Sequence, residues 1–377
     1  MESENTPQLR NVKTHISHHS LCLPEEIIEE ILQRLPVNSL LKFRCVSKSW
    51  RSLIDSRRFI QKHLDYSAEN AQHGIILNSL GPDRGLKQCS LRSMLDDPFT
   101  NQFRVCDSLN IGKGSISVVG SCNGLVCILH ELKHFILWNP STRMSRKLPD
   151  LDHKSKRGHI TSCGFGFDYL SGDYKVFGIL SIFWVTARYE AISKVYSLET
   201  NSWKSVKIGG VPLFSEQGKF ASGKLHWHRT VGLSSDIASF DLRSEAYGVV
   251  ELPCYLRGGC VVSMEVIRGC LSILCDYPSG FNVWIMKQYG VRESWQKVAT
   301  VPQLDNNPVP CLNTFPALLA LGPKGEVVLT HGSTFVIYCP EDDGYRHFQV
   351  KNLAPFRDAN VYVESLVSLT RCDEQEA

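Results

Sequence analysis

The stretch FILWNPSTRMSRKLP, residues 135–149, decides which fold the sequence predicts. It begins as an apolar segment of strand length that ends on an aromatic residue, Trp138. A polar turn of Asn, Pro and Ser follows, because these residues favour the backbone angles of turns. A second strand comes after the turn. The same phrase recurs downstream as KVYSLETNSWKSV, ASFDLRSEAYGVVELP, VWIMKQYGVRESWQKV and VIYCPEDDGYRHFQV.

The spacing of these repeats indicates a β-propeller. The aromatic residues that mark them lie 58, 44, 44 and 54 residues apart, at Trp138, Tyr196, Phe240, Trp284 and Tyr338. In three repeats a second aromatic residue follows seven positions later, at Trp203, Tyr247 and Tyr345. A period of about 40–50 residues with about four strands per unit is typical of propeller blades.

The repeats predict five blades, over residues 116–149, 161–208, 218–253, 261–299 and 315–351. The segment 360–369 has no repeat after it. We expect it to pair with strands from 74–110 and to complete a sixth blade from both chain ends. Such closure removes the exposed sheet edges that an open array would leave. The predicted fold is therefore a small all-α N-terminal unit followed by an all-β domain, a six-bladed β-propeller, with a β-sandwich as the alternative.

Ahead of the repeats, residues 23–54 read LPEEIIEEILQRLPVNSLLKFRCVSKSWRSLI and have a helical pattern. Pro24 suits the first turn of a helix, where its missing N–H is not needed. The residues that follow repeat at helical spacing and form a broad apolar face, until Pro36 ends the helix. A unit of this size rarely buries enough surface to be stable alone. Its surplus apolar surface packs either on the rest of the chain or on a partner protein.

The composition argues against several classes of protein. The net charge is only +3, and Lys and Arg are scattered among acidic residues, so we expect no nucleic-acid partner. No run approaches the ~18 apolar residues of a membrane span, and the N-terminal residues lack a signal peptide. The 14 cysteines contain no C-x-x-C pair. We expect buried, reduced thiols, no metal site and no cofactor, in a protein of the cytoplasm or the nucleus.

The helical stretch resembles the F-box, a motif that docks onto a Skp-type adaptor. The resemblance runs from Leu23 to Leu64 and rests on Leu23-Pro24, Ile31-Leu32, Arg34-Leu35-Pro36, Ser39-Leu40-Leu41 and Arg44-Cys45-Val46-Ser47-Lys48-Ser49-Trp50-Arg51. It implies that the adaptor joins this chain to a cullin and a RING subunit of a ubiquitin ligase. Some of the implied adaptor contacts must be internal core; they are Leu23, Pro24, Ile27, Ile31, Leu35, Pro36, Leu40, Leu41, Val46 and Trp50.

The repeat region is similar to the F-box-associated domain of plant F-box proteins, which are often described as kelch-like. Matching segments begin at Ser121, Leu137, Phe165, Asp173 and Val195. Two glycine pairs, at 209–210 and 258–259, depart from the kelch pattern. The predicted boundaries are a disordered tail at 1–20, the F-box at 21–65, a linker at 66–73, the propeller-like domain at 74–370 and a tail at 371–377.

Catalytic patterns are weak in this sequence. Ser39 and Lys42 fit Ser-x-x-Lys but lie inside a docking helix, and His226 and His228 lack a third metal ligand. We therefore expect a non-catalytic substrate receptor that captures a target protein for ubiquitination and degradation. One alternative is a propeller scaffold, or a glycan- or peptide-binding module, outside ubiquitination. Another is a propeller hydrolase with two carboxylates in its channel.

The target is expected to bind where the second and third strands of each blade meet, since these hairpins share one face of a propeller. The hairpins are predicted at 130–134, 183–189, 229–236, 276–280 and 331–333. Trp, Tyr and Arg often dominate binding energy. The residues expected to contact the target are Phe183, Trp184, Arg188, Tyr189, Arg229 and Tyr277, although Phe183 and Trp184 have packing within the blade as their alternative role.

Overall fold

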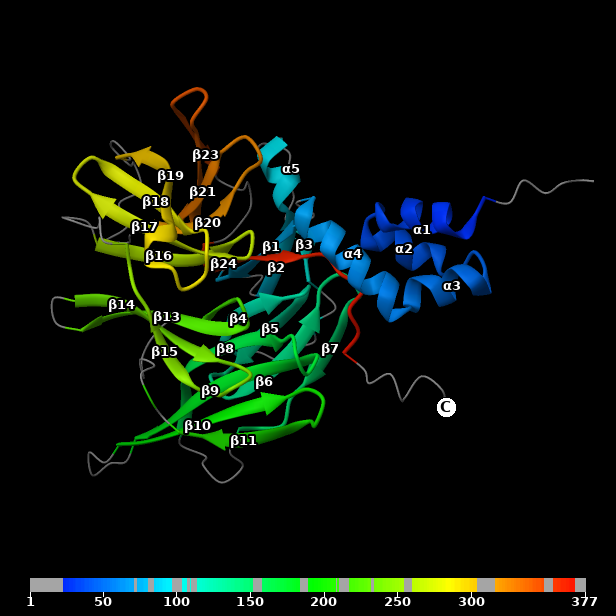
Figure 1. The fold of residues 1–377 in the computed structure, drawn as a ribbon, viewed down its shortest axis with the longest axis horizontal. Coiled ribbons are helices and arrows are strands. Elements are labelled where there is room, and N and C mark those ends of the chain that lie inside the picture. The colour runs from blue at the N-terminus through cyan, green and yellow to red at the C-terminus, as the bar shows by residue number, and fades with distance from the viewer. Residues whose placement is uncertain are drawn as a thin grey trace, which may run out of the picture.

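The structure is a computed structural model. It describes residues 23–70, 73–80, 85–96, 104–106, 109, 114–151, 158–183, 189–207, 209, 217–231, 234–253, 260–303, 316–348 and 355–369. A helical N-terminal unit stands beside a ring of β-sheets, and one long helix leads from the unit into the ring (Figure 1). The tails predicted at 1–20 and 371–377 lie outside the described residues.

Four helices build the N-terminal unit: α1 (Glu25–Gln33), α2 (Val37–Phe43), α3 (Lys48–Asp55) and α4 (Arg57–Glu69). Prolines stand immediately before α1 and α2, where a missing N–H is tolerated. Ser47 and Ser56 begin α3 and α4, and their hydroxyl oxygens accept hydrogen bonds from helix N–H groups at 3.1 and 3.2 Å. Because α4 runs to Glu69, the predicted linker 66–73 is helical over its first four residues.

Six four-stranded sheets form the ring. Five follow the chain in order: β4 (Ile116–Cys122), β5 (Leu125–His130), β6 (His134–Asn139) and β7 (Met144–Lys147); β8 (Gly158–Asp168), β9 (Asp173–Phe183), β10 (Tyr189–Ser197) and β11 (Ser202–Val206); β12 (Lys219–Ala221), β13 (Lys224–Val231), β14 (Ser234–Asp241) and β15 (Tyr247–Val250); β16 (Cys260–Ile267), β17 (Cys270–Tyr277), β18 (Gly280–Met286) and β19 (Trp295–Pro302); and β20 (Ala317–Leu321), β21 (Val327–His331), β22 (Thr334–Cys339) and β23 (Gly344–Phe348). The five predicted blades are confirmed in place and order.

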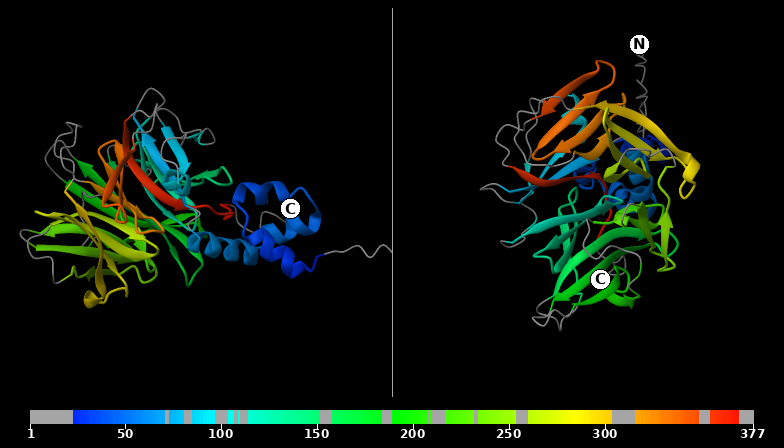
Figure 2. Two further views of the ribbon diagram at one scale, coloured as in Figure 1. Left: turned by 90° about the horizontal axis from the view of Figure 1, so that it is seen from above. Right: turned by 90° about the vertical axis from the view of Figure 1, so that its left-hand side faces the viewer.

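The sixth sheet joins the two ends of the chain. Its strands lie in the order β24 (Phe356–Val363), β1 (His73–Ser79), β2 (Gly85–Ser90) and β3 (Arg104–Val105), with helix α5 (Leu91–Asp96) between the last two along the chain. The antiparallel register places His73 opposite Val363. The last strand ends at Val363, so only the start of the predicted segment 360–369 is strand. The six-bladed β-propeller is confirmed, and the β-sandwich alternative is wrong (Figure 2).

The aromatic spacing that predicted the repeats reflects pairs across neighbouring strands. Tyr196 lies opposite Trp203 in the register of β10 and β11, with ring centroids 5.3 Å apart. The equivalent pairs, at 5.0 and 5.3 Å, are Phe240 with Tyr247 and Tyr338 with Tyr345. The fourth repeat breaks the rule because a longer connection there contains a short 3₁₀ helix, η1 (Arg292–Ser294). Aromatic pairs of this kind stabilise adjacent strands.

Apolar clusters fill the space between neighbouring sheets. One cluster joins Leu137 and Phe135 of β6 to Ile160 of β8 and Val176 of β9, all at most 4% exposed. A second joins Phe177 of β9 to sheet β12–β15. Burial of these side chains on both sides of each sheet holds the ring together.

Candidate functional site

An apolar strip lies exposed on the helical unit. Leu23 is 57% exposed, Ile27 44%, Ile31 48% and Val46 60%. Ile27 and Ile31 stand one helical turn apart on α1, so they lie on the same face. None of the four packs on the propeller strands. Several exposed apolar side chains of this size on one small unit are typical of a surface that binds another protein.

Contacts between α1 and α4 hold this strip outward. The Lys62 ammonium lies 2.6 Å from the Glu29 carboxylate, and the Gln33 amide donates to the Lys62 carbonyl at 3.2 Å. The hydrogen bond from Lys62 lowers the pKa of Glu29. Nearby, His63 lies buried with Nε2 2.9 Å from the Leu35 carbonyl, and burial lowers the pKa of His63. Its imidazole is therefore held in the neutral form.

The predicted adaptor contacts divide into surface and core. Pro24 and Pro36 are exposed beside the strip, whereas Leu35, Leu41 and Trp50 are half-buried. The Trp50 ring meets Phe43 edge-on, with centroids 5.7 Å apart. The prediction that Leu40 contacts the adaptor is corrected by the structure. Leu40 is fully buried in the core of the helical unit and presents no surface to a partner.

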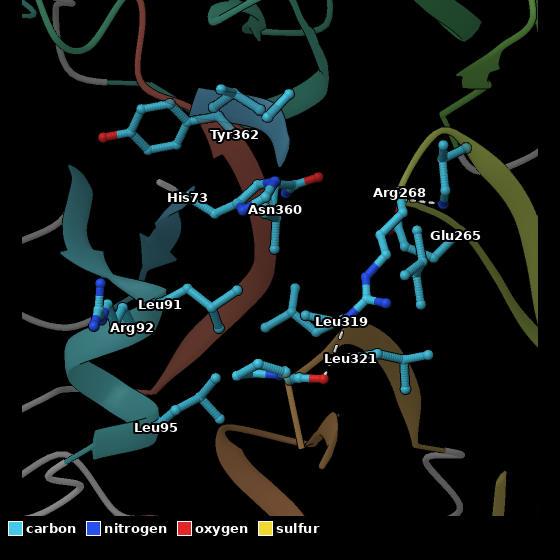
Figure 3. A pocket seen from close by; sticks show the side chains of 18 of the residues that line it. His73, Leu91, Arg92, Leu95, Glu265, Arg268, Leu319, Leu321, Asn360 and Tyr362 are labelled. Atoms are coloured by element: carbon cyan, nitrogen blue, oxygen red, sulfur yellow. Dashed lines mark hydrogen bonds between the residues drawn. The ribbon is translucent and has the colours of Figure 1, made fainter. Parts of the chain in front are cut away.

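A cavity of about 1370 Å³ opens at the end of the central channel that faces α4. The innermost strands of all six sheets line it, together with the last turn of α4. Leu91 and Leu95 of α5 stand on one side and Leu319 and Leu321 of β20 on the other (Figure 3). Arg268 reaches in from the turn after β16 (Figure 3). The cavity thus combines apolar walls with a charged rim.

Charged groups also line the channel itself. The Lys219 ammonium on β12 lies 2.5 Å from the Glu265 carboxylate on β16, so this ion pair joins two blades. Burial raises the pKa of Asp358, on the innermost strand β24, to about 6. The Glu265 carboxylate is therefore paired with Lys219, whose charge also acts on Asp358. Within the described part of the chain, no three His, Cys, Asp or Glu side chains form a metal site.

The two histidines considered as metal ligands have other partners. The Lys219 carbonyl can only accept, so Nδ1–H of His226 donates to it at 3.1 Å, and Nε2 accepts from the Tyr289 hydroxyl at 2.8 Å. Burial lowers the pKa of His226 to about 4. His228 Nε2 lies 2.6 Å from the Ser235 hydroxyl instead. These contacts make His226 a link between blades.

The structure places two of the predicted target-binding residues. Strands β13 and β14 extend to the side of the ring away from the helices (Figure 1). There Arg229 forms a two-bonded ion pair with Asp236 across the hairpin, with Nη2 2.9 Å from Oδ2. Tyr277, on the next blade, is half-buried and packs against the apolar cluster between sheets β12–β15 and β16–β19. The ion pair fixes the Arg229 side chain at the hairpin.

The other predicted target contacts are not placed. Trp184 and Arg188 lie outside the described residues. Phe183 and Tyr189 belong to β9 and β10, whose backbones pair with each other at this point, but their side chains also lie outside the described part. The hairpin at 183–189 therefore stays a prediction.

Cysteines contribute buried thiols. Ten are free among the described residues, and six of these are buried. Burial raises the pKa of Cys163 and of Cys275 to about 12, so both remain protonated thiols. A protonated thiol is a poor nucleophile.

The helical strip and the ring correspond to two families of known proteins. Residues 20–62 match the F-box domain, and residues 91–366 match the F-box associated beta propeller domain. The chain belongs to the F-box proteins. The predicted resemblance is confirmed for both parts of the chain.

Relatives of this F-box protein come from a plant. It is 33% identical over 365 residues to the F-box/kelch-repeat protein At3g23880 of Arabidopsis thaliana, covering 92% of this chain and 95% of that protein. It is 31% identical over 376 residues to the F-box protein CPR1 of the same plant, covering 92% and 88%. The similarity spans the helical unit and the propeller together.

Sequence reasoning missed the cavity at the channel mouth. Its walls come from six distant segments and from α5, a short helix that the sequence analysis treated as part of an all-β region. No local pattern brings such segments together. Within the described residues, no helix is both long and apolar enough to cross a membrane.

Proposed function

We propose that this F-box protein is the substrate-recognition subunit of a Skp–cullin–F-box ubiquitin ligase. One observation carries the proposal: the apolar strip Leu23, Ile27, Ile31 and Val46 is 44–60% exposed on helices that match the F-box domain. The chain's own propeller leaves it uncovered. A Skp-type adaptor is the partner that would bury this strip and link the chain to a cullin and a RING subunit.

In this proposal the chain holds a target protein and neither makes nor breaks covalent bonds. The propeller captures a target protein, and the adaptor assembly brings a conjugating enzyme to the target's lysines. Proximity of this kind lowers the barrier to transfer by several kcal/mol in well-oriented systems. Such a receptor needs no cofactor, and it acts in the cytoplasm or the nucleus, where the ligase is assembled.

The target is proposed to bind at the hairpin face of the propeller, away from the helices. Arg229 is held there by Asp236, so its position is fixed before a partner arrives. Tyr277 stands on the adjacent blade with its ring partly exposed. The residues expected at 183–189 would complete this face. Because Asp236 already balances the Arg229 charge, this pair would offer hydrogen-bonding groups to a partner, not a free positive charge.

The adaptor contact is tested by co-purification with a Skp-type adaptor. Replacing both Ile27 and Ile31 by Asp puts two charges into the apolar strip and is expected to weaken adaptor binding at least a hundredfold. Replacing Val249 and Val291 by Asp is the matched control, because these valines are 55% and 41% exposed on the propeller.

The outcomes separate the receptor from the scaffold alternative. Loss of adaptor binding in the variant with Asp at Ile27 and Ile31, but not in the control with Asp at Val249 and Val291, supports the receptor. If the unmodified chain fails to bind the adaptor, the chain is a propeller scaffold or binding module outside ubiquitination. If the isoleucine variant binds the adaptor normally, the apolar strip is not the docking surface.

A further inference from the structure

The segment that follows β24 contacts both the propeller and the helical unit. β24 ends at Val363, and residues 364–369 continue without regular secondary structure. Ser365, Leu366 and Leu369 of this segment are 0%, 7% and 4% exposed. Burial of this degree is unusual for an irregular segment. The segment is therefore held by specific contacts on more than one side.

Asn139, at the end of β6, fastens the segment to the propeller. Its side-chain amide donates to the carbonyls of Ser365 at 3.1 Å and Val367 at 2.8 Å. Asn139 is itself fully buried, and its Oδ1 accepts from the Ser141 N–H at 2.9 Å within the turn. Arg146 adds a hydrogen bond to the Leu369 carbonyl at 3.3 Å. The Asn139 side chain thus stabilises its own turn and binds the segment through hydrogen bonds.

The propeller surface also fits the segment closely. The Gly124 backbone, in the turn between β4 and β5, lies directly against Ser365, so that a Cβ there would overlap the Ser365 hydroxyl. Leu369 packs into the apolar cluster between sheets β4–β7 and β8–β11. These contacts fix the position of the segment on the surface of sheets β4–β7 and β8–β11.

Leu366 points the other way, into the helical unit. It joins the core formed by Leu32, Val37, Ile54 and Phe59. Leu366 therefore attaches the helical unit to the propeller in addition to the chain that runs from α4 into β1. The chain from α4 into β1 alone would allow the helical unit to rotate about it, whereas the contact at Leu366 restricts that rotation.

We propose that residues 364–369 are a positioning element that fixes the direction of the adaptor-docking helices relative to the propeller, with Asn139 as the residue that holds it. Its importance for ubiquitin transfer rests on the proposed function, because a fixed geometry raises the effective concentration of the target near the conjugating enzyme. The geometric claim itself does not depend on that function.

Two substitutions test the element from opposite sides. Leu366→Asp puts a charge into the helical core, and Asn139→Asp keeps the turn acceptor while replacing the donating amide by an oxygen that repels the two carbonyls. Asp241→Asn is the matched control. Asp241 ends β14 in the equivalent turn, where its Oδ1 accepts from the Arg243 and Ser244 N–H groups at 2.9 Å.

The measurement is single-molecule energy transfer in the full chain, between dyes on unnatural amino acids at Ser52 of α3 and Ser279 of the β17–β18 hairpin, both exposed positions. The unmodified chain and Asp241→Asn are expected to give one narrow distance distribution. Leu366→Asp and Asn139→Asp are expected to broaden it at least twofold.

Adaptor affinity and far-ultraviolet circular dichroism accompany the distance measurement. Asn139 lies outside the helical unit, so Asn139→Asp carries the test even if Leu366→Asp unfolds the helices. A distribution as narrow as that of the unmodified chain in Asn139→Asp overturns the proposal. Failure of the unmodified chain to bind a Skp-type adaptor would overturn the proposed function instead and leave the distance comparison intact.

Discussion

The indole N–H of Trp203 donates a hydrogen bond to the carbonyl of Pro149, 2.7 Å away in the preceding blade. In three further blades, an aromatic side chain of the outermost strand also donates a hydrogen bond to a carbonyl at the end of the preceding blade. These donors are Tyr247, Trp295 and Tyr345, at 2.9, 3.0 and 2.5 Å. The aromatic signature of the repeat is therefore also a series of links between blades.

Removing one of these links is predicted to lower stability modestly. Tyr345→Phe deletes only the hydroxyl that donates to the Pro302 carbonyl, and the ring keeps its contact with Tyr338. The loss is expected to be about 1 kcal/mol in the free energy of unfolding, measured by urea denaturation. Tyr169→Phe, at a ring that is 66% exposed, is the control and should leave stability unchanged. Equal effects of the two variants would contradict the role of the link.

Acid is predicted to weaken the fold through His226. Its pKa is about 4 in the folded chain and near 6.5 when exposed, so the unfolded chain binds the proton first as the pH falls. The stability that neutral His226 contributes is complete above about pH 6.5 and is lost between 6.5 and 4. The loss amounts to about 3 kcal/mol.

Urea denaturation at a series of pH values checks this prediction. His226→Gln should flatten the decline between pH 6.5 and 4, because the amide cannot titrate. His228→Gln is the matched control, since that imidazole is only half-buried beside Ser235. A decline that is as steep in His226→Gln as in the unmodified chain rules out His226 as its source.

Asp358 is predicted to act in the opposite direction. Its pKa is raised by burial to about 6, so the folded chain holds the proton more tightly than the unfolded chain does. The resulting contribution is complete below about pH 4 and disappears as the pH rises through 6. At pH 7 the buried carboxylate opposes folding. Asp358→Asn should therefore raise the free energy of unfolding at pH 7, by at most about 3 kcal/mol, and change it little at pH 4.

The exposed Asp96, 73% accessible at its side chain, supplies the control for this comparison. Asp96→Asn should change stability by less than about 0.5 kcal/mol at either pH. A stability gain in Asp358→Asn that is the same at pH 4 and pH 7 would show that ionisation of this carboxyl is not the cause.

The division of the F-box residues into core and surface gives a paired prediction. Leu40→Ala removes a fully buried side chain and should destabilise the helical unit by about 2–5 kcal/mol. Ile31→Ala, at a residue that is 48% exposed, should leave helical unfolding nearly unchanged and weaken adaptor binding about tenfold. Circular dichroism during heating and a binding titration measure the two effects. A loss of helix stability in Ile31→Ala comparable to that in Leu40→Ala would place Ile31 in the core instead.

Local patterns were sufficient to predict the ring. Strand signals separated by turn residues gave the five internal blades, and the unpaired last segment gave the sixth, because a sheet edge left open is unfavourable. The register behind the aromatic spacing, such as Tyr196 opposite Trp203, follows from a turn of constant length. The break at Trp284 and Trp295 follows from the longer connection that contains η1.

Long-range contacts could not be predicted from these patterns. Leu40 and Ile31 look alike in a helical pattern, and only packing shows that one is core and the other surface. The hydrogen bond from Asn139 to the Val367 carbonyl joins positions 228 residues apart, and Asn139 resembles an ordinary turn residue in the sequence. The cavity at the channel mouth depends on the same kind of distant convergence.

The pairing of β24 with β1 also sets an order of events during synthesis. The helices that carry the apolar strip leave the ribosome well before Leu366, which packs into their core, and before β24, the inner neighbour of β1. A polypeptide cut short before Phe356 would display the docking helices without a finished ring. If those helices bind the adaptor as proposed, such a fragment would occupy the ligase without delivering a target, and would act as a dominant inhibitor of the intact protein.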